Sequence, residues 1–484
     1  MFGFPLDVIL LFAVTMPFVG WLFSKSRFRS FCGIYVIVGL LISAYSLYTV
    51  SHEALVNPVR IDASLDYLHS SLKIDALGVF MTAIIIAIGI FTAIYSLRFM
   101  ERDTGIPLYY TLLMLMIAGM TGVVFANDFF TLFIFWELMS ISSYILVAFR
   151  KQNREPIEAG LKYLVMGAAG SASLLFGIGL IYGLAGTLNF EALTSALSNA
   201  KNGWLYFASL LVFTGFGIKA AIVPLHTWLP DAYSAAPSSI SAILSAVVTE
   251  TGIYALCRVF FTVFNPIQIE WPFIFAILSI ITMTFGNIVA LLQTDLKRLI
   301  AYSSIGHIGY MLVGLASANQ LGLTGTMLHI LNHALMKGAA FFCAGALIYR
   351  LGAGSLDEIA GAGRKMPITM IALGISLFAL MGMPPTNGFI SELTLFMASV
   401  QANMAWLGIA IVLNSALSAG YYLRVIRTLI QPAKSKKIES LKEAPALMLI
   451  PICIMAALII LFGIWPDPII ELARKAAAAL PYVT

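Results

Sequence analysis

The chain has 484 residues, of which 60% are hydrophobic and only 11% charged, and its mean hydropathy is +0.94. Soluble globular domains carry about a quarter charged residues, so this composition excludes a water-soluble fold. A membrane-crossing helix uses about 20 residues, and the apolar residues are enough for roughly fourteen crossings. The formal net charge is +5, but in a membrane protein the distribution of lysine and arginine matters more than their sum. We expect a polytopic membrane protein.

The first apolar segment covers residues 4–22. Lys25, Arg27 and Arg29 follow this segment instead of preceding it, which is unlike a cleavable signal peptide. The segment is therefore expected to be a first spanning helix that starts on the outer side of the membrane.

Apolar segments of spanning length recur along the whole sequence. They fall at residues 4–22, 30–50, 75–97, 107–126, 129–149, 156–184, 203–224, 238–265, 272–293, 299–317, 322–349, 367–399, 404–430 and 446–465. This pattern predicts fourteen transmembrane helices. The polar interruption 51–74 predicts a small extramembrane hairpin or loop, and residues 469–484 predict a short surface helix.

The basic residues test this topology, because they collect in cytoplasmic loops. With fourteen spans, 19 of the 28 lysines and arginines fall in the loops of one side and 6 in those of the other. The six are Arg60, Lys73, Lys201, Arg258, Arg474 and Lys475, and the three within apolar segments are Lys162, Lys219 and Lys337. The asymmetry predicts a multi-pass protein of the cell membrane (inner or plasma membrane) with both termini on the outer side.

Proline interrupts two of the segments. Pro224 lies within the seventh segment, and Pro384 and Pro385 lie within the twelfth. Proline removes a helix hydrogen bond, and irregular backbone at membrane depth needs protein or water around it. Interrupted helices in corresponding places of two halves are typical of transporters with internal repeats. Because the two breaks lie five segments apart, an odd number, corresponding helices run in opposite directions and the repeats are predicted to be inverted.

The predicted organisation has four parts. Residues 1–106 hold helices 1–3, residues 107–265 the first repeat (helices 4–8), residues 266–430 the second repeat (helices 9–13), and residues 431–484 a basic loop, the last helix and a short tail. The predicted fold class is all-α, with about fourteen transmembrane helices and two inverted five-helix repeats that each contain a broken helix.

The sequence lacks the patterns of common redox, hydrolytic and nucleotide sites. The four cysteines are scattered through apolar stretches, which argues against iron–sulfur, zinc and c-type haem sites. No Walker A loop is present, and no G-x-G-x-x-G follows a strand pattern. We expect no cofactor, no metal and no nucleic-acid partner. Any enzymatic activity is expected to depend on partner subunits of a larger complex.

A charge inside a bilayer is costly, so buried charged residues are functional candidates. Glu137 lies in the middle of the fifth segment, and Lys219 lies five residues before Pro224. If the two face each other, a small displacement of the carboxylate would switch the lysine between binding and releasing a proton. The alternative is a static buried ion pair, which we rank lower because such pairs are weak evidence for stability. His226 follows the break and is a candidate gate between the lysine and a water-filled entrance.

The eleventh segment carries His329, His333 and Lys337 at spacings of i, i+4 and i+8, which places all three on one helical face. A stripe of titratable groups in an apolar helix suits a proton relay through intervening water. The alternative is a set of hydrogen-bonded core histidines. Three groups on one face favour the relay.

Two further carboxylates lie deep in the predicted spans. Glu392 lies seven residues past Pro385 and is the only deep carboxylate of the second half, so we predict that it is the terminal proton site. Glu250 is either a relay carboxylate between the halves or a group kept neutral by burial, and we favour the relay. Four other charged residues lie near segment ends, where snorkelling explains them: Lys162, Asp295, Lys297 and Arg298.

Five stretches resemble the proton-translocating, antiporter-like subunits shared by complex I, Mrp cation/proton antiporters and energy-converting membrane-bound hydrogenases. They are FWELMSISSYILVA, GFGIKAAIVPLHTWLPDAYSAAPSSISAILS, LKRLIAYSSIGHIGYMLVG, HALMKGAAFFCAG and PPTNGFISE, and the resemblance runs from about residue 73 to 430. It implies a fold of fourteen helices with two inverted five-helix repeats. It also implies partner subunits in a multisubunit membrane complex.

The same resemblance implies a role for each buried group. Glu137 and Lys219 would form the pair that drives conduction, His333 and Lys337 would belong to the central relay, and Glu392 would be the exit site.

The sequence departs from the family at Glu250, where members usually have lysine. The departure reverses the charge of the link between the half-channels and puts their proton exchange in doubt.

The expected function is to move H⁺, with Na⁺ as an alternative ion, along buried Glu, Lys and His side chains and water. The form NGFISE resembles hydrogenase-type subunits more than it resembles typical Mrp subunits, and we expect a hydrogenase-type or Mrp-type complex. A proton-pumping subunit of a complex I-type NADH–quinone oxidoreductase is the alternative. A non-conducting scaffold subunit is a second alternative, which Glu250 keeps open, and nothing in the sequence favours a third, a quinone-binding subunit.

Overall fold

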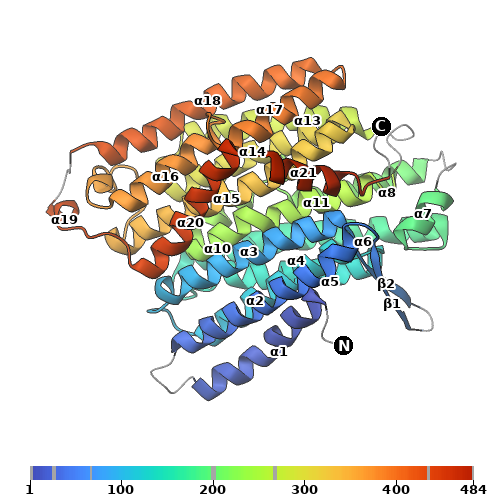
Figure 1. The fold of residues 1–484 in the computed structure, drawn as a ribbon, viewed down its shortest axis with the longest axis horizontal. Helices are drawn as coiled ribbons and strands as arrows, with labels where there is room; N and C mark the ends of the chain where they lie inside the picture. Colours follow the sequence, from blue (N-terminus) through green and yellow to red (C-terminus); the bar gives the residue numbers. More distant parts are fainter. Residues whose placement is uncertain are drawn as a thin grey trace.

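The computed structural model describes residues 4–23, 29–65, 68–197, 203–264, 270–432 and 436–481. Lys25, Arg27, Lys201 and Lys434, which entered the charge count above, lie outside this range. Within it, the chain is a bundle of roughly parallel and antiparallel helices with one small hairpin (Figure 1).

Twelve helices of the described chain are long and apolar enough to cross a membrane. They are α1 (Pro5–Phe23), α2 (Arg29–Ala54), α3 (Ala76–Phe99), α4 (Ile106–Phe125), α5 (Phe129–Val147), α6 (Arg154–Ala185), the continuous run of α10 (Ser238–Ile243), η1 (Leu244–Val248) and α11 (Thr249–Phe260), α13 (Trp271–Leu291), α14 (Leu296–Ser317), α15 (Gln320–Leu351), α18 (Ala405–Ile430) and α20 (Ala446–Ile464). Each falls on one of the apolar segments that the sequence predicts. The prediction of an all-α membrane fold is confirmed.

Two shorter apolar helices, α8 (Gly203–Lys219) and α16 (Pro367–Leu380), end where the sequence predicts the breaks. The chain continues without regular helix and then enters α9 (Leu229–Ala235) and α17 (Asn387–Gln401). Both predicted interruptions are therefore present.

Several shorter elements complete the described chain. They are the strands β1 (Val59–Leu65) and β2 (Leu68–Ile74), the helices α7 (Phe190–Ala196), α19 (Lys436–Glu439) and α21 (Asp467–Ala477), and the short turn η2 (Ala362–Arg364). The strands pair antiparallel, with Val59 opposite Ile74, so the interruption 51–74 contains a hairpin, as predicted. The predicted surface helix near the end of the chain corresponds to α21.

Polar side chains fix several helix starts. The carboxylates of Asp75, Asp128 and Asp295 accept hydrogen bonds from backbone N–H groups in the first turns of α3, α5 and α14, and Asn319 does the same for α15. These N–H groups have no partner within the helix, so the caps satisfy them where the chain enters the bilayer.

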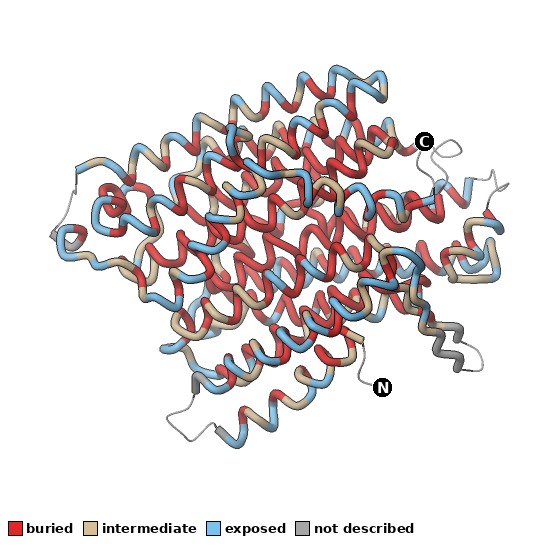
Figure 2. Tube along the Cα trace, in the orientation of Figure 1, coloured by how far each residue is buried: buried red, intermediate tan, exposed pale blue. Residues whose placement is uncertain are grey.

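Burial divides the bundle into inner and outer helices (Figure 2). The run α10–α11 is buried along its whole length and α14 and α15 are buried almost throughout, whereas α1, α6, α18 and α20 expose much of their apolar surface. In a bilayer the outer apolar faces meet lipid. The inner helices carry Glu250, His307, His329, His333 and Lys337, all of them buried, which places these groups away from lipid.

The start of α1, the β1–β2 hairpin and α7 lie at one end of the bundle, and α19 lies at the other (Figure 1). Residues 478–481, which follow α21, line a cavity with Lys73 and Phe190, so the last described residues share the end at which α1 begins. The predicted side of the membrane for the two termini stays a prediction.

Candidate functional site

The first broken helix presents Lys219 at the last position of α8. Beyond it, Ala221 has φ 55°, a left-handed conformation that is uncommon for a residue with a side chain. The indole N–H of Trp228 donates to the Ile218 carbonyl at 2.7 Å, so the unwound segment satisfies part of its own backbone. On the other side, Gly252 of α11 lies so close to Ala220 that a Cβ at position 252 would come within 2.8 Å of its nitrogen. The break is therefore enclosed by protein.

Lys219 is buried between two tyrosines. Its ammonium donates to the Tyr163 hydroxyl at 3.0 Å and lies 5.2 Å and 5.0 Å from the ring centroids of Tyr144 and Tyr163. The Tyr163 ring stacks on Trp228, with centroids 3.9 Å apart and planes at 6°. The cation is thus stabilised by one hydroxyl and two aromatic faces.

Glu137 does not form an ion pair with Lys219 within the described structure. Its carboxylate instead accepts a hydrogen bond from the Ser171 hydroxyl. Ser171 and Tyr163, the two hydroxyl partners, both come from α6 and are eight residues apart, so they lie on one face of that helix. The direct contact that the sequence prediction supposes is absent from this conformation, and the conducting role of Glu137 and Lys219 stays a prediction.

Glu250 lies on α11 directly after the π-helical turn η1, a type of local irregularity frequent at functional sites. Its Oε1 shares a hydrogen bond with Nδ1 of His333, and both side chains are 0% exposed. Glu250 Oε2 and His333 Nε2 have no partner among the described residues. The contact joins the helix that ends the predicted first repeat to α15 of the second.

Three histidines from two helices meet beside this pair. His307 of α14 approaches His329 of α15, with Nδ1 to Nε2 at 3.2 Å, and the rings of His307 and His333 have centroids 5.2 Å apart. His329 Nδ1 lies 3.0 Å from the Ser391 hydroxyl of α17. The result is a row of polar groups that runs from Glu250 across α15 and α14 to the second broken helix.

Lys337 is 0% exposed and lies at the other end of the α15 stripe. Its ammonium donates to the Ser303 hydroxyl, to the Ile300 carbonyl at 3.2 Å and to the Tyr422 hydroxyl at 3.5 Å. The Tyr422 hydroxyl also lies 3.5 Å from Nε2 of His307. His329 and Lys337 both contact α14, and the His333 ring lies beside that of His307, so all three predicted groups approach the same neighbouring helix.

Glu392 lies on α17, one residue after Ser391. Its Oε2 accepts a hydrogen bond from the Ser415 hydroxyl at 2.6 Å, while its Oε1 has no partner in the described chain. The carboxylate borders a cavity of about 340 Å³. Gly382, at φ 66°, closes the other side so tightly that a Cβ there would overlap the carboxylate. Glycine is required at that position for both reasons.

His226 stands apart from these groups. Its ring packs edge-on against Phe285, with centroids 4.6 Å apart, and its Nδ1 has no partner among the described residues. The structure does not bring it into contact with Lys219 or the histidine row, so its role as a gate stays a prediction.

Sequence reasoning missed several hydrogen-bonding partners of the predicted groups. They are Tyr163, Ser171, Ser303, Ser391, Ser415 and Tyr422. His307 stood out in the sequence as a histidine deep in an apolar segment, but no specific role was predicted for it. Across the described residues, no group of three or more His, Cys, Asp and Glu side chains has the arrangement of a metal site.

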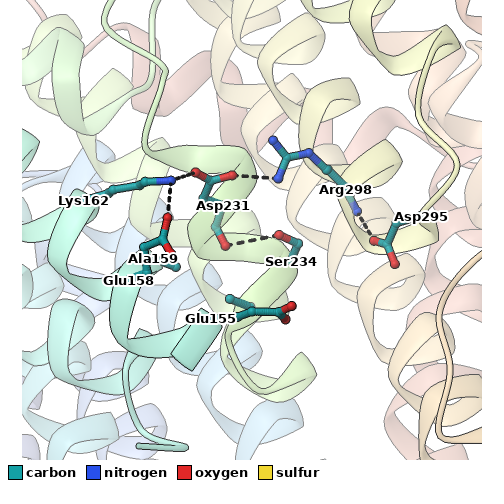
Figure 3. Close-up of a pocket in the computed structure, with 9 residues that line it drawn as sticks. Glu155, Glu158, Ala159, Lys162, Asp231, Ser234, Asp295 and Arg298 are labelled. Carbon is teal, nitrogen blue, oxygen red and sulfur yellow. Dashed lines mark hydrogen bonds and ion pairs between the residues drawn. The ribbon is translucent and has the colours of Figure 1, made fainter. Parts of the chain in front are cut away.

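Three of the four charged residues at segment ends, Lys162, Asp295 and Arg298, line a cavity of about 340 Å³ (Figure 3). Asp231 of α9 accepts from Lys162 of α6 at 2.9 Å and from Arg298 of α14 at 2.6 Å. The snorkelling expectation is wrong for Lys297, which is 5% exposed and donates inward to backbone carbonyls, because α9 ends directly beside it.

Residues 126–418 match the family described as NADH:quinone oxidoreductase/Mrp antiporter, TM, and residues 65–110 match the N-terminal part of NADH-ubiquinone oxidoreductase (complex I) chain 5. The chain is 33% identical over 468 residues to F(420)H(2) dehydrogenase subunit N of Methanosarcina mazei, covering 95% of this chain and 94% of the relative. It is 37% identical over 370 residues to NADH-quinone oxidoreductase subunit N of Granulibacter bethesdensis, covering 75% and 77%.

Among solved structures, the chain is similar to a subunit of the membrane-bound sulfane sulfur reductase, an archaeal respiratory membrane complex. The TM-score is 0.90 at 28% identity, and the match covers 99% of this chain and 97% of the other. The family match, the identity along nearly the whole sequence and the shared fold agree. The chain belongs to the family of antiporter-like membrane subunits of NADH:quinone oxidoreductases and Mrp antiporters.

Proposed function

We propose that this chain is a proton-translocating subunit of a multisubunit respiratory membrane complex, of the subunit N type. The observation that carries the proposal is the row of buried groups from Glu250 through His333, His307 and His329 to Ser391, next to Glu392. Buried titratable groups at hydrogen-bonding distance are what a proton relay needs, whereas a purely structural core has little use for so many costly charges.

The names of the relatives bear on which complex this is. The relatives named above are subunits N of an F(420)H(2) dehydrogenase and of an NADH-quinone oxidoreductase. They favour a complex I-type assembly, the alternative reading of the sequence, over the hydrogenase-type or Mrp-type complex that NGFISE suggests. A segment of six residues carries less weight than identity over 95% of the chain.

The proposed topology has fourteen spans. We count α8 with α9, and α16 with α17, as two interrupted spans in addition to the twelve long helices. An even number is supported by the start of α1 and residues 478–481 lying at the same end of the bundle. The positive-inside asymmetry would then place both termini outside and the Asp231 cavity on the cytoplasmic side. Two inverted five-helix repeats, helices 4–8 and 9–13, follow from this count.

In this proposal protons reach Lys219 from the cytoplasmic side, pass through Glu250 to the histidines, and leave by Glu392. Glu250 and His333 exchange a proton directly, because their nitrogen and oxygen share a hydrogen bond. Their two unpartnered atoms, Oε2 and Nε2, are where water would connect the pair to its neighbours. Glu137 and Lys219 are not paired in this conformation. We propose that movement of Glu137 toward Lys219 would favour the protonated lysine, and movement away would favour release of the proton.

Two rivals make different predictions. A sodium pathway needs clustered oxygen ligands, whereas the row at the centre is built mainly from nitrogen donors and acceptors, so we favour H⁺. A scaffold subunit would tolerate loss of the relay. The contact of Glu250 with His333 argues against a scaffold, because it makes the unusual glutamate part of the row of buried polar groups.

The test is Lys219→Ala in the intact complex, assayed in sealed vesicles. Proton uptake, followed by quenching of a pH-sensitive acridine dye, and electron transfer are measured in the same sample. We expect proton translocation per electron to fall, with assembly retained. Unchanged proton translocation would contradict the conducting role of the subunit and support the non-conducting scaffold. Repeating the wild-type assay with and without Na⁺ tests the ion, since strict dependence on Na⁺ would contradict proton translocation.

A further inference from the structure

The charged residues at the start of α14 bind α9 through two kinds of hydrogen bond. Arg298 donates to the Asp231 carboxylate at 2.6 Å (Figure 3). Lys297, the preceding residue, donates to the carbonyls of Ser234 and Ala236, at 2.9 Å and 2.5 Å. These carbonyls lie at the C-terminal end of α9, where a cation also meets the negative end of the helix dipole. Two adjacent residues of the second repeat thus hold both a side chain and the backbone end of α9.

The other end of α9 is connected to Lys219. Trp228 is the residue before α9, and it donates to the carbonyl of Ile218, the neighbour of Lys219. Its ring stacks on Tyr163, whose hydroxyl accepts the lysine's hydrogen bond. A displacement of α9 would therefore disturb the Trp228 hydrogen bond to Ile218 and the stack of Trp228 on Tyr163, both of which adjoin the lysine.

Helix α14 continues the connection from α9 to the central relay. Ser303, five residues after Arg298, is the hydroxyl partner of Lys337. His307, one turn further on, contacts His329. One helix therefore touches α9 with its first turn and the central relay with its next turns.

We propose that Asp231, Lys297 and Arg298 form a clamp of positioning residues that couples the Lys219 site to the Lys337–histidine site. When α14 shifts, α9 follows, and the Tyr163–Trp228 stack changes the environment of Lys219. The proposal rests on the proposed proton translocation and adds a direct mechanical link between the halves. It requires no proton to pass through the clamp.

The ion pair of the clamp, between Asp231 and Arg298, is partly open to solvent, with side-chain exposures of 24% for Asp231 and 37% for Arg298. Exposed ion pairs contribute little to stability, so variants of Asp231 and Arg298 should fold and assemble. Their effect should appear in coupling, which mutations along a connecting element change by about twofold to thirtyfold.

The experiment measures protons translocated per electron and electron-transfer rate in sealed vesicles that hold the intact complex. We expect Asp231→Asn and Arg298→Gln each to lower the proton-to-electron ratio while electron transfer continues. The double variant should be no worse than the more severe single one, because both remove the same contact. Arg298→Lys, which keeps the charge, should recover much of the ratio.

Lys162→Gln is the matched control. Lys162 binds the same Asp231 carboxylate, but it comes from α6 of the first repeat and its side chain is 50% exposed. We expect its ratio to equal that of the wild type. If it falls as far as in Arg298→Gln, the charge balance of the cavity and not the link between halves is responsible, and the clamp is wrong.

Lys297→Met is a second route, because it removes the carbonyl contacts and leaves Asp231 untouched. It should lower the ratio even if Asp231→Asn does not assemble. An unchanged ratio in Lys297→Met and Arg298→Gln, or multiplicative effects in the Asp231/Arg298 double variant, overturns the proposal. Lys219→Ala distinguishes failure of the clamp from failure of the proposed proton translocation. If Lys219→Ala lowers the proton-to-electron ratio and the clamp variants do not, the clamp is contradicted and proton translocation by this subunit is not.

Discussion

The two buried lysines on the proposed path have contrasting surroundings. Lys219, in the first repeat, has a single hydrogen-bond partner within the described structure, the Tyr163 hydroxyl, and its predicted partner Glu137 is bound elsewhere. Lys337, in the second, has a serine hydroxyl, a carbonyl and a tyrosine hydroxyl around it, and Tyr422 leads on to the histidines.

The contrast shows that a buried lysine in each repeat does not give the two sites similar connectivity. In the second repeat, direct contacts join neighbouring groups, so small proton shifts are enough to pass charge along. In the first repeat the polar groups are separated, and water or helix motion must close the gaps. The first site is thus suited to switching and the second to relaying.

The largest effect is expected for His333→Ala, which removes the contact to Glu250 and one of the three clustered rings. Loss of a positioned proton carrier costs about a hundredfold or more in rate. We expect proton translocation per electron to fall by that order in vesicles. His226→Ala is the control, since His226 packs on Phe285 outside the row. Equal loss in both variants would contradict the contrast and favour the gate predicted from sequence.

A matched pair of tyrosines tests the two lysine sites directly. Tyr163→Phe removes the one hydroxyl that Lys219 binds among the described residues and leaves the ring in place. We expect about a tenfold loss of translocation, as for a hydrogen bond to a charged group. Tyr422→Phe leaves Lys337 with Ser303 and the Ile300 carbonyl, so its effect should be clearly smaller. The same vesicle assay ranks the two. The reverse order would mean that the second site, not the first, depends on a single contact.

The sequence was sufficient for the features that depend on one helix at a time. Apolar length predicted the long helices, Pro224 and Pro385 predicted the two breaks, and the i, i+4, i+8 spacing predicted the shared face of α15. Partners on other helices could not be predicted, because which serine or tyrosine faces Lys219 depends on how helices rotate and pack.

Lys297 shows the same limit. Its position near a segment end predicted snorkelling, whereas the end of α9 provides carbonyls that hold it inside. The Lys297 side chain points inward because it binds the carbonyl of Ala236, which is 61 residues away in the sequence.

A smaller effect is expected for Ser391→Ala, which removes the hydroxyl next to His329. One neutral hydrogen bond contributes about 1 kcal/mol, equivalent to about fivefold in rate. Ser399→Ala, on the same helix, is the control, because the Ser399 hydroxyl binds only the Phe396 carbonyl among the described groups. A fivefold loss confined to Ser391→Ala would place the exit step at α17, and equal behaviour of the two would remove Ser391 from the path.

The smallest effect on translocation is expected for the buried pair of Arg258 and Asp75. A substitution there tests whether a buried charged residue belongs to the proton path merely because it is buried. Arg258 donates to both Asp75 oxygens, at 2.6 Å and 2.7 Å, and to the Tyr254 hydroxyl. In the part of the chain that the structure describes, neither partner has a buried atom without a hydrogen bond, unlike Glu250 and His333. Arg258→Lys cannot keep the forked geometry and should destabilise by about 1.5–3 kcal/mol. We expect a lower unfolding temperature of the purified complex with an unchanged proton-to-electron ratio, because a fully satisfied pair has no site for an incoming proton. A reduced ratio at normal thermal stability would extend the path to the hairpin end of α11.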